Sequence, residues 1–226
     1  MNSIRCIIIG SAEIKNYEKI SRFINPEDFI IACDGGLNHV EKLGLSPSAL
    51  NLVVGDFDSF PRDKVLRQAQ QPQGEFVFEG QIIQLPCEKD DTDVFFAVKE
   101  ALRRSFTDFV LVGVIGQRFD HSLVNISVLQ FLQKNGASGV IYDDYSKMKL
   151  VVAGAEPVLV PDTYSYFSLM CIAGDVSGVT IKNAKYPLED ATITSDYQYG
   201  VSNEVLPGQT AEVTLEKGVL LLVMVW

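Results

Sequence analysis

The hydrophobic positions of this chain follow two different patterns, which meet near residue 145. In the first part, short continuous apolar runs alternate with stretches that can form helices. Apolar runs of this kind, rich in β-branched residues, are typical of strands buried in a parallel sheet. We interpret as such strands the runs at residues 6–9, 29–33, 52–54, 81–85, 109–112 and 140–142.

The stretches between these runs predict helices at residues 17–23, at 37–43, from Pro61 onward, at 94–104 and at 122–135. Alternation of strands and helices is typical of α/β proteins, so we predict a mostly parallel sheet flanked by helices over residues 1–145.

Residues 146–226 lack helical periodicity, and turn-forming residues separate short β-rich runs. This spacing predicts a C-terminal all-β domain, either a small sandwich or a partial barrel, of which we favour the sandwich. The runs lie at 158–160, 164–171, 179–181, 191–194, 211–215 and 219–226.

One polar stretch, residues 55–59, follows directly on the third apolar run. Its carboxylates Asp56 and Asp58 lie where the strand should end, at the edge of the sheet where open α/β proteins bind ligands. Two nearby carboxylates repel each other unless they are hydrogen-bonded, share a proton or hold a cation. Oxygen ligands favour Mg²⁺, which binds one or two carboxylates together with substrate phosphates. An ordinary turn is the alternative interpretation, because Asp and Ser are common turn residues.

Further polar segments follow other predicted strands. An Asp-Gly-Gly segment at 34–36 follows the second strand, where exposed backbone N–H groups suit a phosphate, although the same residues also form ordinary turns. The acidic segment 88–93 precedes a predicted helix, which Asp91 or Thr92 would cap. Acidic residues at a helix N-terminus also stabilise the helix dipole without any catalytic role. The segment 113–121 follows the fifth apolar run.

Composition argues against several classes of function. The net charge of −10 opposes binding to a nucleic-acid backbone, and no apolar run approaches the roughly 20 residues of a membrane span. With two histidines and no Cys-x-x-Cys, a His/Cys zinc site is not expected. The four scattered cysteines predict reduced thiols of a cytoplasmic protein, and the N-terminal apolar run is too short for a signal-peptide core.

Because the carboxyl ends of parallel strands share one edge of a sheet, we expect the polar segments to meet in one cleft. The charged residues that would converge are Asp34, Asp56, Asp58, Asp90, Asp93, Asp120, Lys89 and Arg118. The carboxylates need cations and the basic groups need anions, and a metal–nucleotide complex supplies both. The chain has no Gly-x-x-x-x-Gly-Lys, and no Gly-x-Gly-x-x-Gly follows its first strand, which argues against a P-loop or a dinucleotide site.

Together these motifs resemble those of the thiamine pyrophosphokinase family. The resemblance rests on segments in the family's order, at 34–38, 55–59, 89–93, 113–121 with Asn125, and 200–203. Gln117 stands where many members have glycine. The resemblance implies ATP-dependent transfer of a pyrophosphoryl group to the hydroxyl of thiamine, giving thiamine diphosphate and AMP. It also implies Mg²⁺ and a homodimer with composite active sites.

The resemblance further implies roles for individual residues. Asp56, Asp58 and Asp93 would bind Mg²⁺ and receive the hydroxyl proton, with the choice of base left open. The residues facing the nucleotide would be Asp34, Gly35, Gly36, Asn38, Lys89, Asp90, Arg118, Asp120 and His121. The residues contacting thiamine would be Thr92, Ser202 and Asn203. Trp226, Tyr197 and Tyr199 are candidates for stacking on the vitamin, although core packing is favoured for each.

Two other classes of function compete with this interpretation. A phosphatase or phosphotransferase with a nucleophilic aspartate would also carry an Asp-x-Asp motif after an apolar strand, but after the first strand rather than the third. A catalytically silent sensor would bind thiamine or a nucleotide without turnover. The number of carboxylates argues against the sensor, because binding a cationic vitamin does not need so many.

Overall fold

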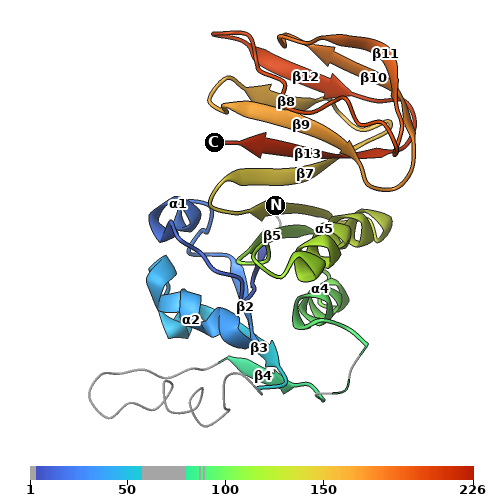
Figure 1. The fold of residues 1–226 in the computed structure, drawn as a ribbon. Helices are drawn as coiled ribbons and strands as arrows, with labels where there is room; N and C mark the ends of the chain where they lie inside the picture. The colour runs from blue at the N-terminus through green and yellow to red at the C-terminus, as the bar shows by residue number, and fades with distance from the viewer. Residues whose placement is uncertain (1–3, 58–79, 87, 89) are drawn as a thin grey trace. The chain divides into compact units, whose positions relative to one another are not determined.

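The structure, a computed structural model, describes residues 4–57, 80–86, 88 and 90–226. The chain divides into two compact units, residues 1–144 and 145–226 (Figure 1). The boundary lies within one residue of the change in hydrophobic pattern. None of the helices in the described ranges has the length and apolar character needed to cross a bilayer.

The first unit contains a parallel sheet with the strand order β4-β3-β2-β1-β5-β6. The strands are β1 (Cys6–Ile9), β2 (Phe29–Cys33), β3 (Leu50–Gly55), β4 (Gln81–Gln84), β5 (Asp108–Val112) and β6 (Ser138–Tyr142). The chain proceeds outward from β1 to β4 and then returns to place β5 beside β1. The strand order therefore reverses between β1 and β5, and such a switch point is where open α/β sheets bind ligands.

Helices cover both faces of this sheet (Figure 1). The helices α1 (Tyr17–Ser21) and α2 (Leu37–Val40) lie on one face, and α4 (Asp93–Arg103) and α5 (Phe119–Lys134) lie on the other. Side chains of adjacent strand residues point to opposite faces, so Ile7 and Ile9 of β1 pack in one cluster with Ile20 of α1 and Val40 of α2. The predicted fold of this part, a mostly parallel sheet flanked by helices, is confirmed.

Some element boundaries differ from the sequence-based expectation. The helix α5 begins at Phe119 rather than at residue 122, which places Asp120 and His121 in its first turn. The predicted helix at 37–43 is α-helical only to Val40 and continues as the 3₁₀ segment Glu41–Leu43. Further 3₁₀ segments are Asp34–Gly36 and Pro47–Ala49. The helix predicted from Pro61 onward lies outside the described residues.

The second unit contains two antiparallel sheets. One consists of β7 (Ser146–Val152), β13 (Val219–Val225) and β9 (Tyr166–Cys171), and the other has the order β11 (Leu188–Ile193), β10 (Val176–Lys182), β12 (Thr210–Thr214) and β8 (Val158–Pro161). The strand β7 was not predicted. Its lysines at 147 and 149 interrupt the apolar pattern, although Met148 and Val151 are buried.

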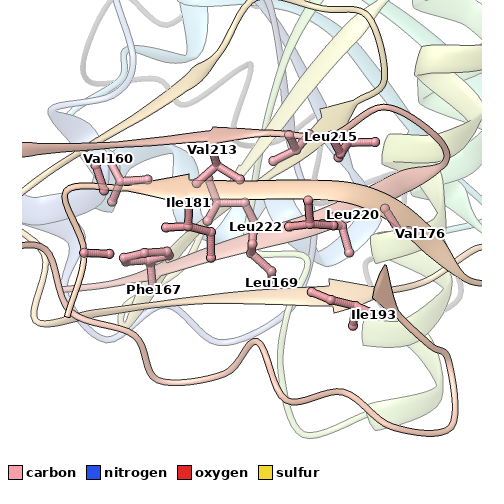
Figure 2. Packing of buried hydrophobic residues seen from close by; sticks show 14 of the residues in the cluster. Val160, Phe167, Leu169, Val176, Ile181, Ile193, Val213, Leu215, Leu220 and Leu222 are labelled. Atoms are coloured by element: carbon pink, nitrogen blue, oxygen red, sulfur yellow. The ribbon is translucent and has the colours of Figure 1, made fainter. Parts of the chain in front are cut away.

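Apolar side chains from both sheets form the core of this unit (Figure 2). Phe167 of β9 and Leu222 of β13 come from one sheet, and Ile181 of β10 and Val213 of β12 come from the other. All four side chains are at most 2% exposed. The unit is therefore the predicted sandwich rather than a partial barrel.

Candidate active site

A cavity of about 800 Å³ lies within the first unit, at the carboxyl ends of its strands. Its walls come from residues 11–13 after β1, Cys33 and Asp34 at the end of β2, Asp56 after β3, the loop after β5, and the first turns of α4 and α5. The cavity therefore lies at the switch point between β1 and β5. Its volume is within the range of about 300–1,000 Å³ that is usual for small-molecule sites.

Asp34 and Asp56 reach the cavity from two neighbouring strands. β2 and β3 pair in parallel with Cys33 opposite Val54. A Cβ on Gly55 would lie 3.0 Å from the Cβ of Asp34, so glycine at this position allows the close approach of the two strand ends. Asp34 has a φ of 41°, in the left-handed region that Asp adopts more readily than most residues.

The backbone turns sharply directly after Asp56. Phe57 has a φ of 61° and is only 7% exposed, with its side chain in the cluster that includes Val53 and Ile9. A positive φ is a true outlier for a bulky residue, and such strain is concentrated at functional sites. Burial of the Phe57 ring therefore holds the chain in a conformation that presents the neighbouring carboxylate to the cavity.

The start of α4 brings a third carboxylate to the cavity. Thr92 is the N-cap, because its Oγ1 accepts a hydrogen bond from the N–H of Phe95 at 3.2 Å. Asp93 is the first residue of the helix, and both Thr92 and Asp93 line the cavity. The Cys33 thiol lies 3.7 Å from the carbonyl oxygen of Asp93 and connects this helix start to the end of β2. The capping and binding interpretations are thus compatible at Thr92.

Basic groups reach the cavity from the loop after β5 and from α5. Arg118 donates from Nε and Nη2 to the two carboxylate oxygens of Asp120, at 3.0 and 2.7 Å. This pairing raises the pKa of Arg118 and holds the pKa of Asp120 below its ordinary range. Arg118 and His121 line the cavity, which also adjoins the positive end of the α5 dipole. Gln117 is not among the residues with positive φ, so the loop does not require glycine there.

The cavity does not include all of the predicted site residues. It includes Asp34, Asp56, Thr92, Asp93, Arg118 and His121, whereas Gly35, Gly36, Asn38, Asp90 and Asp120 are not among its lining residues. A Cβ on Gly36 would collide with the carbonyl oxygen of Ile9, so close packing explains this glycine. Asn38 donates from Nδ2 to the carbonyl of Gly35 at 3.1 Å. Asp58 and Lys89 lie outside the described residues.

Residues 11–13 and Ser122 also line the cavity, although no sequence motif pointed to them. Small or singly charged residues at these positions carry no distinctive signal. The only available signal for residues 11–13 was their place after the first strand. That signal becomes informative only when the strand order makes β1 a border of the switch point.

The predicted thiamine-contacting residues of the second unit are in different environments. Asn203 is 4% exposed, and its amide donates to the carbonyl of Tyr186 at 2.8 Å and accepts from the Tyr186 N–H at 3.0 Å. Ser202 is exposed with a φ of 55°. Core packing, which was favoured for the tyrosines, is wrong: Tyr197 and Tyr199 are 68% and 40% exposed. Core packing fits Trp226 better, because its ring stacks on Tyr164.

The donor set of the cavity fits a hard divalent cation in part. Within the part of the chain that the structure describes, no three His, Cys, Asp or Glu side chains gather closely enough to hold a metal. Asp56 and Asp93 nevertheless supply carboxylate oxygens to the same cavity. Mg²⁺ commonly takes one or two carboxylates and completes its shell with phosphates and water, so this set is sufficient when a polyphosphate is bound.

An acidic cavity at the switch point of a parallel sheet, with an arginine and a helix N-terminus beside it, is typical of α/β enzymes that act on phosphorylated ligands. The family model described as "Thiamin pyrophosphokinase, catalytic domain" matches residues 20–141, and that described as "Thiamin pyrophosphokinase, vitamin B1 binding domain" matches residues 158–220. The chain belongs to the thiamin pyrophosphokinase family. It is therefore an enzyme that transfers pyrophosphate from ATP to thiamine.

Individual relatives agree with this assignment. Thiamine pyrophosphokinase of Bacillus subtilis (strain 168) is 25% identical over 169 residues, 75% of each chain. A crystal structure of thiamine pyrophosphokinase from Bacillus subtilis has a TM-score of 0.82 at 21% identity and covers 98% of both chains. Thiamin pyrophosphokinase from Candida albicans has a TM-score of 0.74 at 13% identity, covering 99% of this chain and 89% of the other. These structural similarities show that the fold is shared.

Proposed function

We propose that the cavity of the first unit binds ATP with Mg²⁺ and is where the pyrophosphoryl group is transferred to thiamine. The observation that carries the proposal is the convergence of Asp34, Asp56, Asp93 and Arg118 on one cavity. Three carboxylates that line the same cavity would repel a triphosphate, so the arrangement is productive only with a cation between carboxylates and phosphates.

Asp56 and Asp93 would hold the metal together with Asp58, which the motif places two residues beyond Asp56. Bound Mg²⁺ would neutralise charge on the polyphosphate. The hydroxyl oxygen of thiamine attacks the β-phosphorus of ATP, and AMP leaves in line. One of these three residues, Asp56, Asp58 or Asp93, receives the hydroxyl proton. The remaining contribution of the protein is orientation and fixed charge, which carry most of the catalysis in phosphoryl transfer.

Arg118 is the described basic residue best suited to the triphosphate. Its two hydrogen bonds to Asp120 use two of the five guanidinium N–H groups, so further donors are available to a ligand. The Arg118 side chain is 71% exposed, and the residue lines the cavity, where a phosphate would replace water as its second partner. Asp120 then serves to orient the guanidinium rather than to contact the nucleotide. We also propose that Lys89 binds the triphosphate, and this role rests on the motif alone.

We further propose a homodimer in which thiamine binds between the cavity of one copy and the second unit of the other. Adjacent large apolar side chains exposed at a surface mark an interaction site, whereas single exposed ones are normal. Phe119 and Leu123, on the first turns of α5, are 71% and 52% exposed. In the second unit, Tyr197 and Val201 are exposed in the segment that leads to Ser202. The acidic cavity also suits the thiazolium ring of thiamine, which is permanently cationic.

This proposal assigns the nucleotide, the metal and catalysis to residues 1–145, and thiamine binding and dimerisation to residues 146–226. The cysteines support a reducing compartment such as the cytoplasm. Within the described residues, the side chains of Cys6, Cys33 and Cys171 are buried, as expected of cysteines in a reduced protein.

The nucleotide product tests the reaction directly. Incubation of the protein with ATP, Mg²⁺ and thiamine should give AMP and thiamine diphosphate in equal amounts, measured by separating both product pools by chromatography. Stoichiometric ADP with thiamine monophosphate would contradict transfer to the β-phosphorus. Release of phosphate without ATP would indicate the nucleophilic-aspartate class, and tight binding without turnover would indicate a sensor.

Turnover should depend on a divalent cation. Removing metal with EDTA should abolish AMP formation, and Mg²⁺ added in excess of the chelator should restore it, because clustered carboxylates and a polyphosphate repel each other without a cation. AMP formation should be followed at fixed ionic strength, with Na⁺ as the control for general screening. Full activity in excess EDTA would refute the metal assignment for Asp56 and Asp93.

A further inference from the structure

We infer that Ser122 is a positioning residue for ATP binding, because its hydroxyl fixes the loop after β5 that carries Arg118. Ser122 lies in the first turns of α5, is 5% exposed and lines the cavity. It has no charge and belongs to none of the acidic motifs. This inference rests on the proposed function, since it acts through the placement of Arg118.

The Ser122 hydroxyl connects α5 to two places in the loop. Its Oγ accepts a hydrogen bond from the N–H of Gly116 at 3.0 Å. The same oxygen lies 3.2 Å from the carbonyl oxygens of both Gly116 and Arg118, to either of which it can donate. One hydroxyl has a single proton, so it donates to one carbonyl at a time while it accepts from Gly116.

Only part of this arrangement is ordinary helix chemistry. Serine in a helix often donates to the carbonyl four residues earlier, which here is that of Arg118. The bonds to Gly116 reach back across six residues and past the helix start, so they hold the loop rather than the helix. A Cβ on Gly116 would lie 2.9 Å from that of Ala12, so the loop also packs tightly against the segment after β1.

A second side chain of α5 fixes the other end of the same loop. Asn125 is 6% exposed and donates from Nδ2 to the carbonyl of Val114 at 2.7 Å. The loop is thus held at Val114, at Gly116 and at Arg118. Little freedom remains for the backbone from which the Arg118 side chain extends. A loop held in its binding conformation avoids the ordering cost that ATP would otherwise have to offset.

The test compares Ser122→Ala with Ser122→Thr and Ser127→Ala. Ser127 is the matched control, because it lies on the same helix and its exposed hydroxyl donates only locally, to the carbonyl of Val124 at 2.6 Å. The probe is the α,β-methylene analogue of ATP with Mg²⁺, titrated by calorimetry. Ser122→Ala should weaken binding about tenfold, equivalent to about 1.4 kcal/mol. Ser122→Thr should bind within about threefold of wild type, because it keeps the hydroxyl, and Ser127→Ala should be unchanged.

A double-mutant cycle with Arg118→Ala separates positioning from general loss of structure. If Ser122 acts by placing Arg118, Ser122→Ala should have little further effect in the Arg118→Ala background. The single variant Ser122→Ala should have a higher KM for ATP than the wild type, whereas its KM for thiamine should be unchanged. Fully additive losses, or equal losses for ATP and thiamine, would overturn the inference while leaving the reaction intact. Unchanged binding in Arg118→Ala would instead refute the proposed role of Arg118.

Discussion

Replacing Asp93 by asparagine should lower kcat/KM for AMP formation by at least about 10²-fold, which is the scale for losing one preorganised electrostatic group. Asp93 begins α4 and lines the cavity with Asp34 and Asp56. Asparagine keeps the size of the side chain and removes its charge, so a metal–polyphosphate complex would lose one of its carboxylate partners. Initial rates at saturating Mg²⁺, measured from AMP, give the effect directly.

The matched control for this prediction is Asp91→Asn. Asp91 belongs to the same acidic segment, but it pairs with Lys99 at 2.6 Å and is not among the cavity-lining residues. Loss of this partly exposed ion pair should change the free energy of unfolding by less than about 1 kcal/mol. Turnover should remain within about twofold, since no group at the site changes. A near-normal rate for Asp93→Asn, with the melting temperatures of both variants intact, would remove Asp93 from the chemistry.

Mixing two inactive variants should restore activity if each site is shared between copies. The variants are Asp93→Asn in the cavity and Ser202→Lys in the second unit. The lysine is tolerated sterically at an exposed position, and its charge opposes the cationic thiazolium ring. In a mixed dimer with two-fold symmetry, one composite site receives both lesions and the other receives neither.

Random pairing of equal amounts makes about half of the dimers mixed, so activity should return to roughly a quarter of that of wild type treated in the same way. The variants are unfolded together and refolded, and native mass spectrometry measures the mixed dimers. If both residues of a site come from one chain, every site keeps one lesion and no activity returns. Mixed dimers without activity would therefore disprove the composite site, while the assigned reaction would stand.

The sequence by itself determined the class of each part of the fold. Continuous apolar runs such as that of β1 specify strands buried on both faces, and the helices between them specify parallel pairing. The acidic segments could be assigned to strand ends from the chain order alone. That is why Asp34, Asp56 and Asp93 were expected to meet, and the described cavity contains all three.

Only the tertiary structure decided which other residues join them. Residues 11–13 and Ser122 line the cavity because β5 pairs with β1, a choice of strand order that no local pattern encodes. Gly36 and Asn38 belong to the same segment as Asp34, yet neither lines the cavity. Gly36 packs against β1, and Asn38 donates a hydrogen bond to a carbonyl of its own turn. Hydrophobic periodicity reports on neighbours within a few residues, whereas a binding site depends on contacts between segments far apart in the chain.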